Sequence, residues 1–184
     1  MKSLVFSTLS FAFTLSMSSC VFNDSPKDNA PFQKLNTASD LRGTYSNKGD
    51  NGIEGYDSYL TYVLWADSAP IQHSQISLVK IQPSKGGSLI VSALSGNRTI
   101  HQKTYYSSHY DWADGKLLLS QQTETANGNI AGAGTNNTYI GIDTRGDLKI
   151  RVQGSAAGIS IIPILATGKS DIRFRRISFS KLKK

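Results

Sequence analysis

The sequence has few of the residues that stabilise small exported domains, such as paired cysteines, and it lacks several common catalytic motifs. Its 184 residues include one cysteine, five prolines and two tryptophans. A single cysteine excludes a disulfide within the chain, so stability has to come from packing and from hydrogen bonds between strands. The sequence also has no Gly-x-Ser-x-Gly turn, no His-Glu-x-x-His pair, no P-loop and no glycine-rich dinucleotide turn. We therefore expect neither an enzyme nor a bound cofactor.

Long apolar runs are also missing, apart from a short one near the N-terminus. Residues 4–17 form a stretch of 14 mostly apolar residues, whereas a membrane-spanning helix needs about 20. The stretch follows Lys2 and leads through Ser18 and Ser19 to Cys20. A basic start, a short apolar segment and small residues at its exit are the features of a secretory signal.

This head resembles the signal of bacterial lipoproteins, in which small residues precede a cysteine that is lipidated and becomes the first mature residue. Met17 stands where leucine is commoner in that family. The resemblance implies a signal peptide over residues 1–19 and a lipid on Cys20, which would anchor an exported protein to the membrane. Val21 rather than aspartate follows the cysteine, and in the family this points to the outer membrane if the organism is Gram-negative.

An ordinary cleaved signal, with Cys20 incidental, is the alternative. It would leave an unpaired thiol in an oxidising compartment, and lipidation removes that anomaly.

The rest of the chain divides into a predicted tether and one predicted domain. Residues 20–39 are mostly polar, contain two prolines and have no periodicity, so we expect a lipidated, flexible tether. Residues 40–184 are long enough for a single domain.

The positive charge of the chain is concentrated at its C-terminus. The formal net charge is +7, and residues 173–184 hold six basic residues and no acid. This tail is predicted to be the solvated face of a last strand or, as the alternative, to contact anionic lipid headgroups. A basic tail on an exported, anchored chain does not indicate nucleic-acid binding, and aromatic residues do not alternate with the basic ones as stacking platforms require.

Short stretches rich in β-forming residues alternate with glycine-containing turns over the predicted domain. The expected strands are residues 43–46, 59–65, 75–82, 88–94, 98–106, 116–125, 138–143, 147–153, 159–165 and 171–179. In the last of these the apolar positions shift phase by one residue, which predicts a β-bulge. Pro163 predicts a bulge or a sheet edge.

This pattern predicts an all-β domain of about eight to ten antiparallel strands. We expect an up-and-down, lipocalin-like barrel, with a two-sheet sandwich as the less favoured alternative. Gly43 and Tyr45 resemble, weakly, the opening strand of lipocalin-like barrels, where a Gly-x-Trp closes the base; tyrosine replaces the tryptophan here.

One segment concentrates amphipathic rings between two predicted strands. If the protein binds a ligand in this region, we expect Tyr106, His109, Tyr110 and Trp112 to contact it. These rings could equally fold back and plug the end of a barrel. His73, His101 and His109 have no tight metal-ligand spacing, so we do not predict a metal site.

The function predicted from these observations is binding rather than catalysis. We expect a membrane-anchored lipoprotein whose β-domain binds an envelope component or a partner protein. The alternative is a carrier of a small apolar ligand, held in a barrel interior lined by Leu148, Ile150 and Val152, with an aromatic gate near Trp112.

Overall fold

The computed structural model describes residues 18–65, 72–127, 130–159 and 163–177. Residues 1–17 of the predicted signal and residues 178–184 of the basic tail lie outside this part. Most described residues form β-strands, with one short helix, α1 (Leu60–Leu64). No described helix is long and apolar enough to cross a membrane. Single 3-10 turns are η1 (Ala38–Leu41), η2 (His73–Gln75), η3 (Lys85–Gly87) and η4 (Ser107–His109).

The largest sheet contains the longest strands. In spatial order it consists of β1 (Ser18–Asp24), β13 (Pro163–Phe174), β12 (Leu148–Ile159), β11 (Ile130–Asp143), β10 (Lys116–Asn127) and β9 (Asp111–Ala113), with β2 (Phe32–Gln33) paired to the end of β11. All neighbours are antiparallel except β1, which runs parallel to β13. We call this the long sheet.

A second sheet of four antiparallel strands packs near one end of the long sheet. Its order is β3 (Gly43–Ser46), β6 (Leu78–Pro83), β7 (Leu89–Ser95) and β8 (Arg98–Tyr105), and a small separate pair is formed by β4 (Lys48–Gly49) and β5 (Ser58–Tyr59). Gly96 links β7 to β8 with φ +57°, and Gly146 links β11 to β12 with φ +87°. Both turns were expected from the sequence, because glycine adopts positive φ without steric cost.

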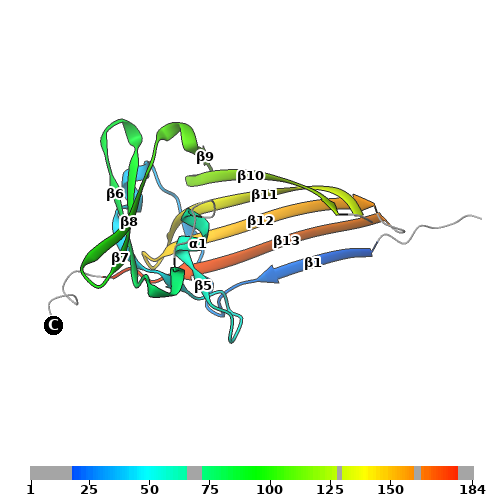
Figure 1. The fold of residues 1–184 in the computed structure, drawn as a ribbon, viewed down its shortest axis with the longest axis horizontal. Coiled ribbons are helices and arrows are strands. Elements are labelled where there is room, and N and C mark those ends of the chain that lie inside the picture. The colour runs from blue at the N-terminus through cyan, green and yellow to red at the C-terminus, as the bar shows by residue number, and fades with distance from the viewer. Residues whose placement is uncertain (1–17, 66–71, 128–129, 160–162, 178–184) are drawn as a thin grey trace, which may run out of the picture.

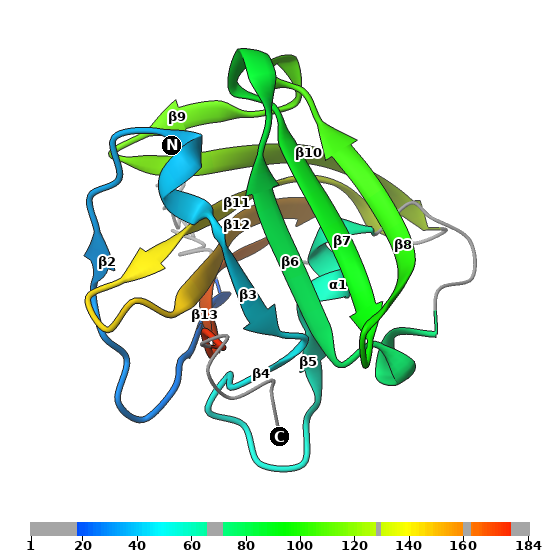
Figure 2. The ribbon, with the colours of Figure 1, turned by 90° about the vertical axis from the view of Figure 1, so that its left-hand side faces the viewer.

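The two sheets and α1 enclose one hydrophobic core (Figure 2). Its largest fully buried apolar side chains are Trp65, Tyr45, Phe174, Leu41, Leu60, Leu148, Ile150, Val79 and Val91. Tyr45 donates its hydroxyl to the carbonyl of Leu41 at 3.0 Å, and burial raises the pKa of Tyr45 to about 12, so the ring stays neutral. The predicted all-β class is confirmed, but the described strands form sheets that do not close into a barrel.

The chain passes from one sheet to the other directly after β13. That strand pairs with β12 in unbroken register up to Phe174. The next residues then pair with β3: Arg175 accepts a hydrogen bond from Ser46 N at 2.8 Å, and Ile177 N donates to Thr44 O at 2.8 Å. The shift in apolar phase, predicted to be a β-bulge, is therefore a change of sheet.

Strands β10 to β13 extend far beyond the core, with β1 alongside them (Figure 1). They are 12 to 14 residues long, so at about 3.3 Å per residue they span about 40–46 Å. The sequence changes along them: the core end of β12 reads Leu-Lys-Ile-Arg-Val, and its far end reads Gly-Ser-Ala-Ala-Gly-Ile. The apolar alternation therefore stops where the second sheet no longer covers the strands.

Two predicted strands have different structures. Residues 60–64 form α1, where Leu60, Thr61, Leu64 and Trp65 are buried on one side; this spacing of three to four residues suits a helix as well as a short strand. The predicted strand 159–165 is instead the end of β12 and the start of β13, with Ile159 paired to Pro163. Proline is tolerated there because it is the first residue of its strand.

The segment before the predicted domain is folded. Backbone pairing along β13 includes Cys20 to Asp24, and Pro26, Ala30 and Leu35 are buried. Leu35 N donates to Gly115 O at 3.0 Å. The expectation of a flexible tether over residues 20–39 is therefore wrong, because this segment contacts the long sheet along its course.

Candidate functional site

The long sheet has a core face and an outer face with different side chains. On β12, Leu148 and Ile150 are fully buried in the core, and Lys149 and Arg151 alternate with them. Successive side chains of a strand point to opposite faces, so the two basic residues lie on the outer face. The sequence pattern predicts a solvated face, but Lys149 is only 2% exposed.

Lys149 is buried together with an acid from the neighbouring strand. Its Nζ lies 3.1 Å from Oδ2 of Asp171, which is fully buried. Arg151 binds the same carboxylate through two atoms, with Nε at 2.6 Å from Oδ1 and Nη2 at 2.8 Å from Oδ2. Burial alone would raise the pKa of Asp171, but hydrogen bonds from Arg151, Asn29 and Lys149 outweigh it and hold that pKa well below its usual range. The carboxylate is therefore ionised and fully engaged.

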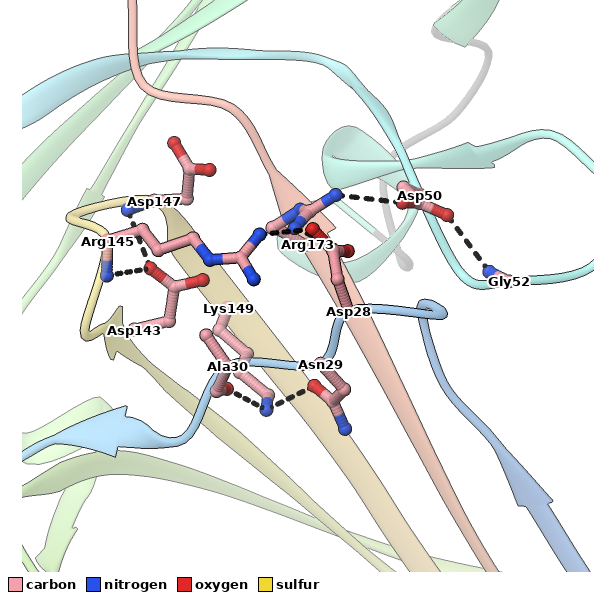
Figure 3. Close-up of polar contacts among 10 residues, drawn as sticks. All are labelled: Asp28, Asn29, Ala30, Asp50, Gly52, Asp143, Arg145, Asp147, Lys149 and Arg173. Atoms are coloured by element: carbon pink, nitrogen blue, oxygen red, sulfur yellow. Dashed lines mark hydrogen bonds and ion pairs between the residues drawn. The ribbon is translucent and has the colours of Figure 1, made fainter.

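For Lys149, burial has a larger effect on the pKa than the partner does. Burial lowers the pKa of Lys149, and the hydrogen bond to Asp171 opposes that shift. A buried charge needs a complete set of partners. Lys149 has them, because its ammonium also donates to Asn29 Oδ1 at 2.5 Å and to the carbonyl of Ala30 at 2.7 Å (Figure 3).

Residues 25–33, which we call the strap, cover this ion cluster. Asn29 donates its Nδ2 to Asp171 Oδ2 at 2.8 Å. The ring of Phe32 lies 4.9 Å from the Lys149 ammonium and 5.0 Å from the Arg151 guanidinium, distances that allow cation–π attraction. The strap thus contributes both polar and aromatic partners to charges on the long sheet.

A second set of ion pairs, more exposed to solvent, holds the strap at Asp28. Asp28 accepts hydrogen bonds from Arg173 at 2.8 Å and from Arg145, and Arg173 also pairs with Asp50 at 3.0 Å (Figure 3). The turn that carries Arg145 is held by Asp143, whose Oδ1 accepts the backbone N–H of Arg145 at 2.9 Å. The strap is therefore linked to the end of β13 and to the β11–β12 turn.

Hydrogen bonds from Arg145 and Arg173 lower the pKa of Asp28 to about 2. A carboxylate with a depressed folded-state pKa stabilises the fold above its unfolded value of about 4, and this contribution is lost as the pH falls from about 4 to 2.

We expect Asp28→Ala to loosen the strap without unfolding the domain. The substitution removes two ion pairs at an exposed edge, so local opening should increase and trypsin should cleave after the exposed Lys34, directly after the strap, roughly threefold faster or more. Timed proteolysis followed by mass spectrometry measures this rate. Asp24→Ala is the matched control, since Asp24 is exposed and has no ion-pair partner among the described residues. Equal cleavage rates in the two variants would contradict the role given to Asp28.

Beyond the ion cluster, the outer face is hollowed into a site of about 550 Å³, which we call the polar hollow. Its described lining residues are Asn23, Thr135, Asn137, Gln153, Gly154, Ser155, Thr167, Gly168 and Lys169. They form two rows across the strands. In register, the first row is Asn137, Gln153, Lys169 and Asn23, and the second is Thr135, Ser155 and Thr167.

The chemistry of the polar hollow is amide, hydroxyl and a single ammonium. No acid, aliphatic or aromatic side chain is among its described lining residues. Lys169 is half-buried, and no described residue forms an ion pair with it. The described lining residues therefore offer many hydrogen-bond donors and acceptors and, in Lys169, one cation without an ion-pair partner among the described residues. This set suits a polar ligand.

The interior between the sheets is packed. The apolar space there measures about 20 Å³ and is lined by Leu41, Leu64, Ile81, Leu89, Val91, Tyr105, Leu117, Leu119 and Ile140. Cavities that hold drug-sized ligands are roughly 300–1,000 Å³. Leu148 and Ile150, predicted to line a carrier cavity, are fully buried in this core, so this space has no room for an apolar ligand.

The four predicted ligand-binding side chains lie between the end of β8 and β9. The polar hollow is instead formed by β11, β12, β13 and β1, so none of the four is among its described lining residues. Tyr110 is buried and donates its hydroxyl to Gly87 O, so its ring packs against the domain rather than facing solvent. Tyr106 and Trp112 are 56% and 42% exposed. The structure pairs the rings as Tyr106 with His109, at 5.4 Å between centroids, and Tyr110 with Trp112, at 6.5 Å.

The residues of the ion cluster and the polar hollow were not singled out as a site from the sequence. The one signal present was the alternation of Lys149, Arg151 and Gln153 with apolar residues, which places all three on one face of a strand. Among the described residues, no group of three or more His, Cys, Asp or Glu side chains could hold a metal ion. No protein-family description, curated protein or solved structure matches this chain.

Proposed function

We propose that the chain is a lipoprotein of the bacterial cell envelope, anchored through Cys20, whose β-domain binds an envelope component. The N-terminal sequence supports the anchor: a basic start, a short apolar segment and two serines precede the cysteine. The absence of a catalytic sequence motif favours binding over catalysis. Val21 after the cysteine favours the outer membrane of a Gram-negative organism.

The observation that carries the proposal is the pairing of β1 with β13. Cys20 is in register with Ala166, at the end of the long sheet that projects from the core. Ala166 is eight residues from Phe174, where β13 reaches the core, a distance of about 26 Å along the strand. A lipid on Cys20 would thus place the projecting end at the membrane and the core away from it.

The sequence at this end is suited to a lipid surface. Residues 159–165 read Ile-Ser-Ile-Ile-Pro-Ile-Leu, without a charged residue. Ile159 and Pro163 pair where β12 ends and β13 begins, so the described ends of this apolar stretch belong to the same end of the sheet as Cys20. Arg175 and Arg176 follow β13 at its opposite end, and this favours the solvated alternative for these two basic residues.

In this arrangement the strand β1, rather than a flexible tether, joins the lipid to the domain. If cleavage occurs before Cys20, the mature chain begins inside β1, and the lipid is attached directly to the long sheet. The polar hollow, which includes Asn23 of the same strand, would then be held a short distance from the membrane. We do not extend the proposal to a lipocalin-like carrier, because the apolar space described between the sheets measures only about 20 Å³.

Cys20→Ala tests the anchor. In a Gram-negative host, we expect the wild-type N-terminal tryptic peptide, residues 20–27, to carry the mass of a diacylglyceryl group and a fatty acid, and the protein to sediment with membranes. The alanine variant should lose both properties. Ser19→Ala is the matched control, because it keeps a small residue before an intact cysteine. A wild-type peptide without lipid, or a Cys20→Ala protein that stays with membranes, would refute the anchor.

A further inference from the structure

The polar hollow is suited to one class of envelope component, and this inference rests on the function proposed above. We propose that it binds a glycan strand of N-acetylated amino sugars that bears a carboxylate. Four features of the hollow lead to this ligand: its size, its hydrogen-bonding groups, its single cation and its place on a sheet face.

The size and lining exclude several other ligands. A volume of about 550 Å³ lies within the range of small-molecule sites, roughly 300–1,000 Å³. Those sites are mostly apolar, and an apolar ligand here would leave the exposed amide of Gln153 facing a surface that cannot accept or donate hydrogen bonds. A metal ion would need carboxylate or imidazole ligands, and none is among the described lining residues.

An extended peptide is also disfavoured. Strand addition requires the free backbone N–H and C=O groups of a sheet edge. The hollow instead lies across the faces of β11, β12 and β13, whose backbones are paired on both sides at these positions. Gln153, for example, pairs with Asn137 on one strand and with Lys169 on the other. At β11, β12 and β13 the recognition therefore comes from side chains; β1, which contributes Asn23, is the one lining strand at a sheet edge among the described residues.

Those side chains match a glycan. Primary amides such as that of Gln153 can donate and accept together, as the acetamido group and hydroxyls of an amino sugar do. Ser155 and Thr167 add hydroxyls in the next row. Tyr139 is not among the lining residues, but it lies two residues from Asn137 on the same strand and face. Its half-buried ring is therefore an aromatic surface beside the hollow on which a longer glycan can pack.

Lys169 selects for a negative group on the glycan. It is half-buried, and no described residue neutralises it. The neighbouring Arg151 is committed to Asp171 through two hydrogen bonds, so among the described residues here Lys169 is a single available cation rather than part of a basic patch. One cation suits one carboxylate per sugar repeat better than it suits a densely charged polymer.

The test measures glycan binding by the full chain, solubilised from whole cells in detergent, by isothermal titration calorimetry. The probes are the neutral tetrasaccharide of N-acetylglucosamine and an oligosaccharide of alternating N-acetylglucosamine and N-acetylmuramic acid without peptides; heparin serves as the charge-only probe. We expect both amino-sugar probes to bind, the carboxylate-bearing one more tightly. Gln153→Ala should weaken both by roughly three- to tenfold, and Lys169→Gln should remove only the preference for the carboxylate.

Gln82→Ala, at an exposed glutamine of the second sheet, is the matched control and should leave binding unchanged; equal thermal midpoints verify that each variant is folded. Failure of both amino-sugar probes to bind, or tighter binding of heparin that Gln153→Ala leaves intact, would overturn the inference. Mass spectrometry of the same samples separates the two proposals. Glycan binding without lipid on Cys20 refutes only the anchor, and lipidated protein without glycan binding refutes only this inference.

Discussion

Replacing Asp171 with alanine is expected to lower the free energy of unfolding by about 3–5 kcal/mol. The carboxylate is fully buried and is the shared partner of Lys149, Arg151 and Asn29. Its removal leaves the Lys149 ammonium, itself 2% exposed, with two neutral oxygen acceptors from the strap and no counter-charge. Desolvation of that ammonium would no longer be offset by the ion pair, and this produces the large loss.

Urea unfolding followed by circular dichroism measures the effect. Asp57→Ala is the matched control, since both side chains of the Asp57–Lys48 ion pair are about half exposed or more, and such a pair contributes little to stability. If Asp171→Ala costs no more than Asp57→Ala, the buried cluster does not stabilise the domain in the way its geometry indicates.

The contribution of Asp171 to the free energy of unfolding should fall at acidic pH. Its pKa is lowered in the folded state, so its contribution is complete above the unfolded value of about 4. That contribution should be lost only as the pH falls to strongly acidic values. Wild-type protein should therefore keep this part of its stability across the neutral range, and Asp171→Ala should lack it throughout.

Local sequence patterns predicted the strands well where one face is buried. Residues 43–46 form a strand with the predicted bounds, and the alternation of Leu148 and Ile150 with polar residues marks the core face of β12. These patterns reflect the two-residue period of a strand. This alternation involves only residues that are close together in the chain, so it can be recognised in the sequence without knowledge of the fold.

The parts that could not be predicted depend on contacts between distant residues. Lys149 follows the pattern of a solvated side chain, but Asn29 and Ala30, about 120 positions earlier, cover it. The same strap was predicted to be a flexible tether, because its composition is polar and contains prolines. Nothing in the local sequence of residues 18–33 encodes the pairing of β1 with β13 or the contacts of the strap with Lys149 and Asp171. The ion cluster, and the part of the polar hollow that β1 contributes, were therefore both missed.

The link between the two sheets leads to the second large expected effect, that of Phe174→Ala. Phe174 is fully buried at the end of β13, in register with Leu148. It is the last residue before the chain leaves the long sheet and pairs with β3. Its ring also packs closely against Gly49, where a Cβ atom would come within 2.5 Å of Phe174 Cε1. One side chain thus fills the space where both sheets and β4 meet.

Truncation of this ring should cost about 3–5 kcal/mol, the usual range for a buried phenylalanine, because lost burial and a residual cavity add together. Urea unfolding measures the change, and Tyr106→Ala is the matched control, since that ring is 56% exposed and its loss should shift stability by less than about 1 kcal/mol. Similar costs for the two variants would show that Phe174 does not hold the sheets together. Folded Phe174→Ala protein should still bind glycan, because Lys169 lies five residues along β13 and on the opposite face of the sheet.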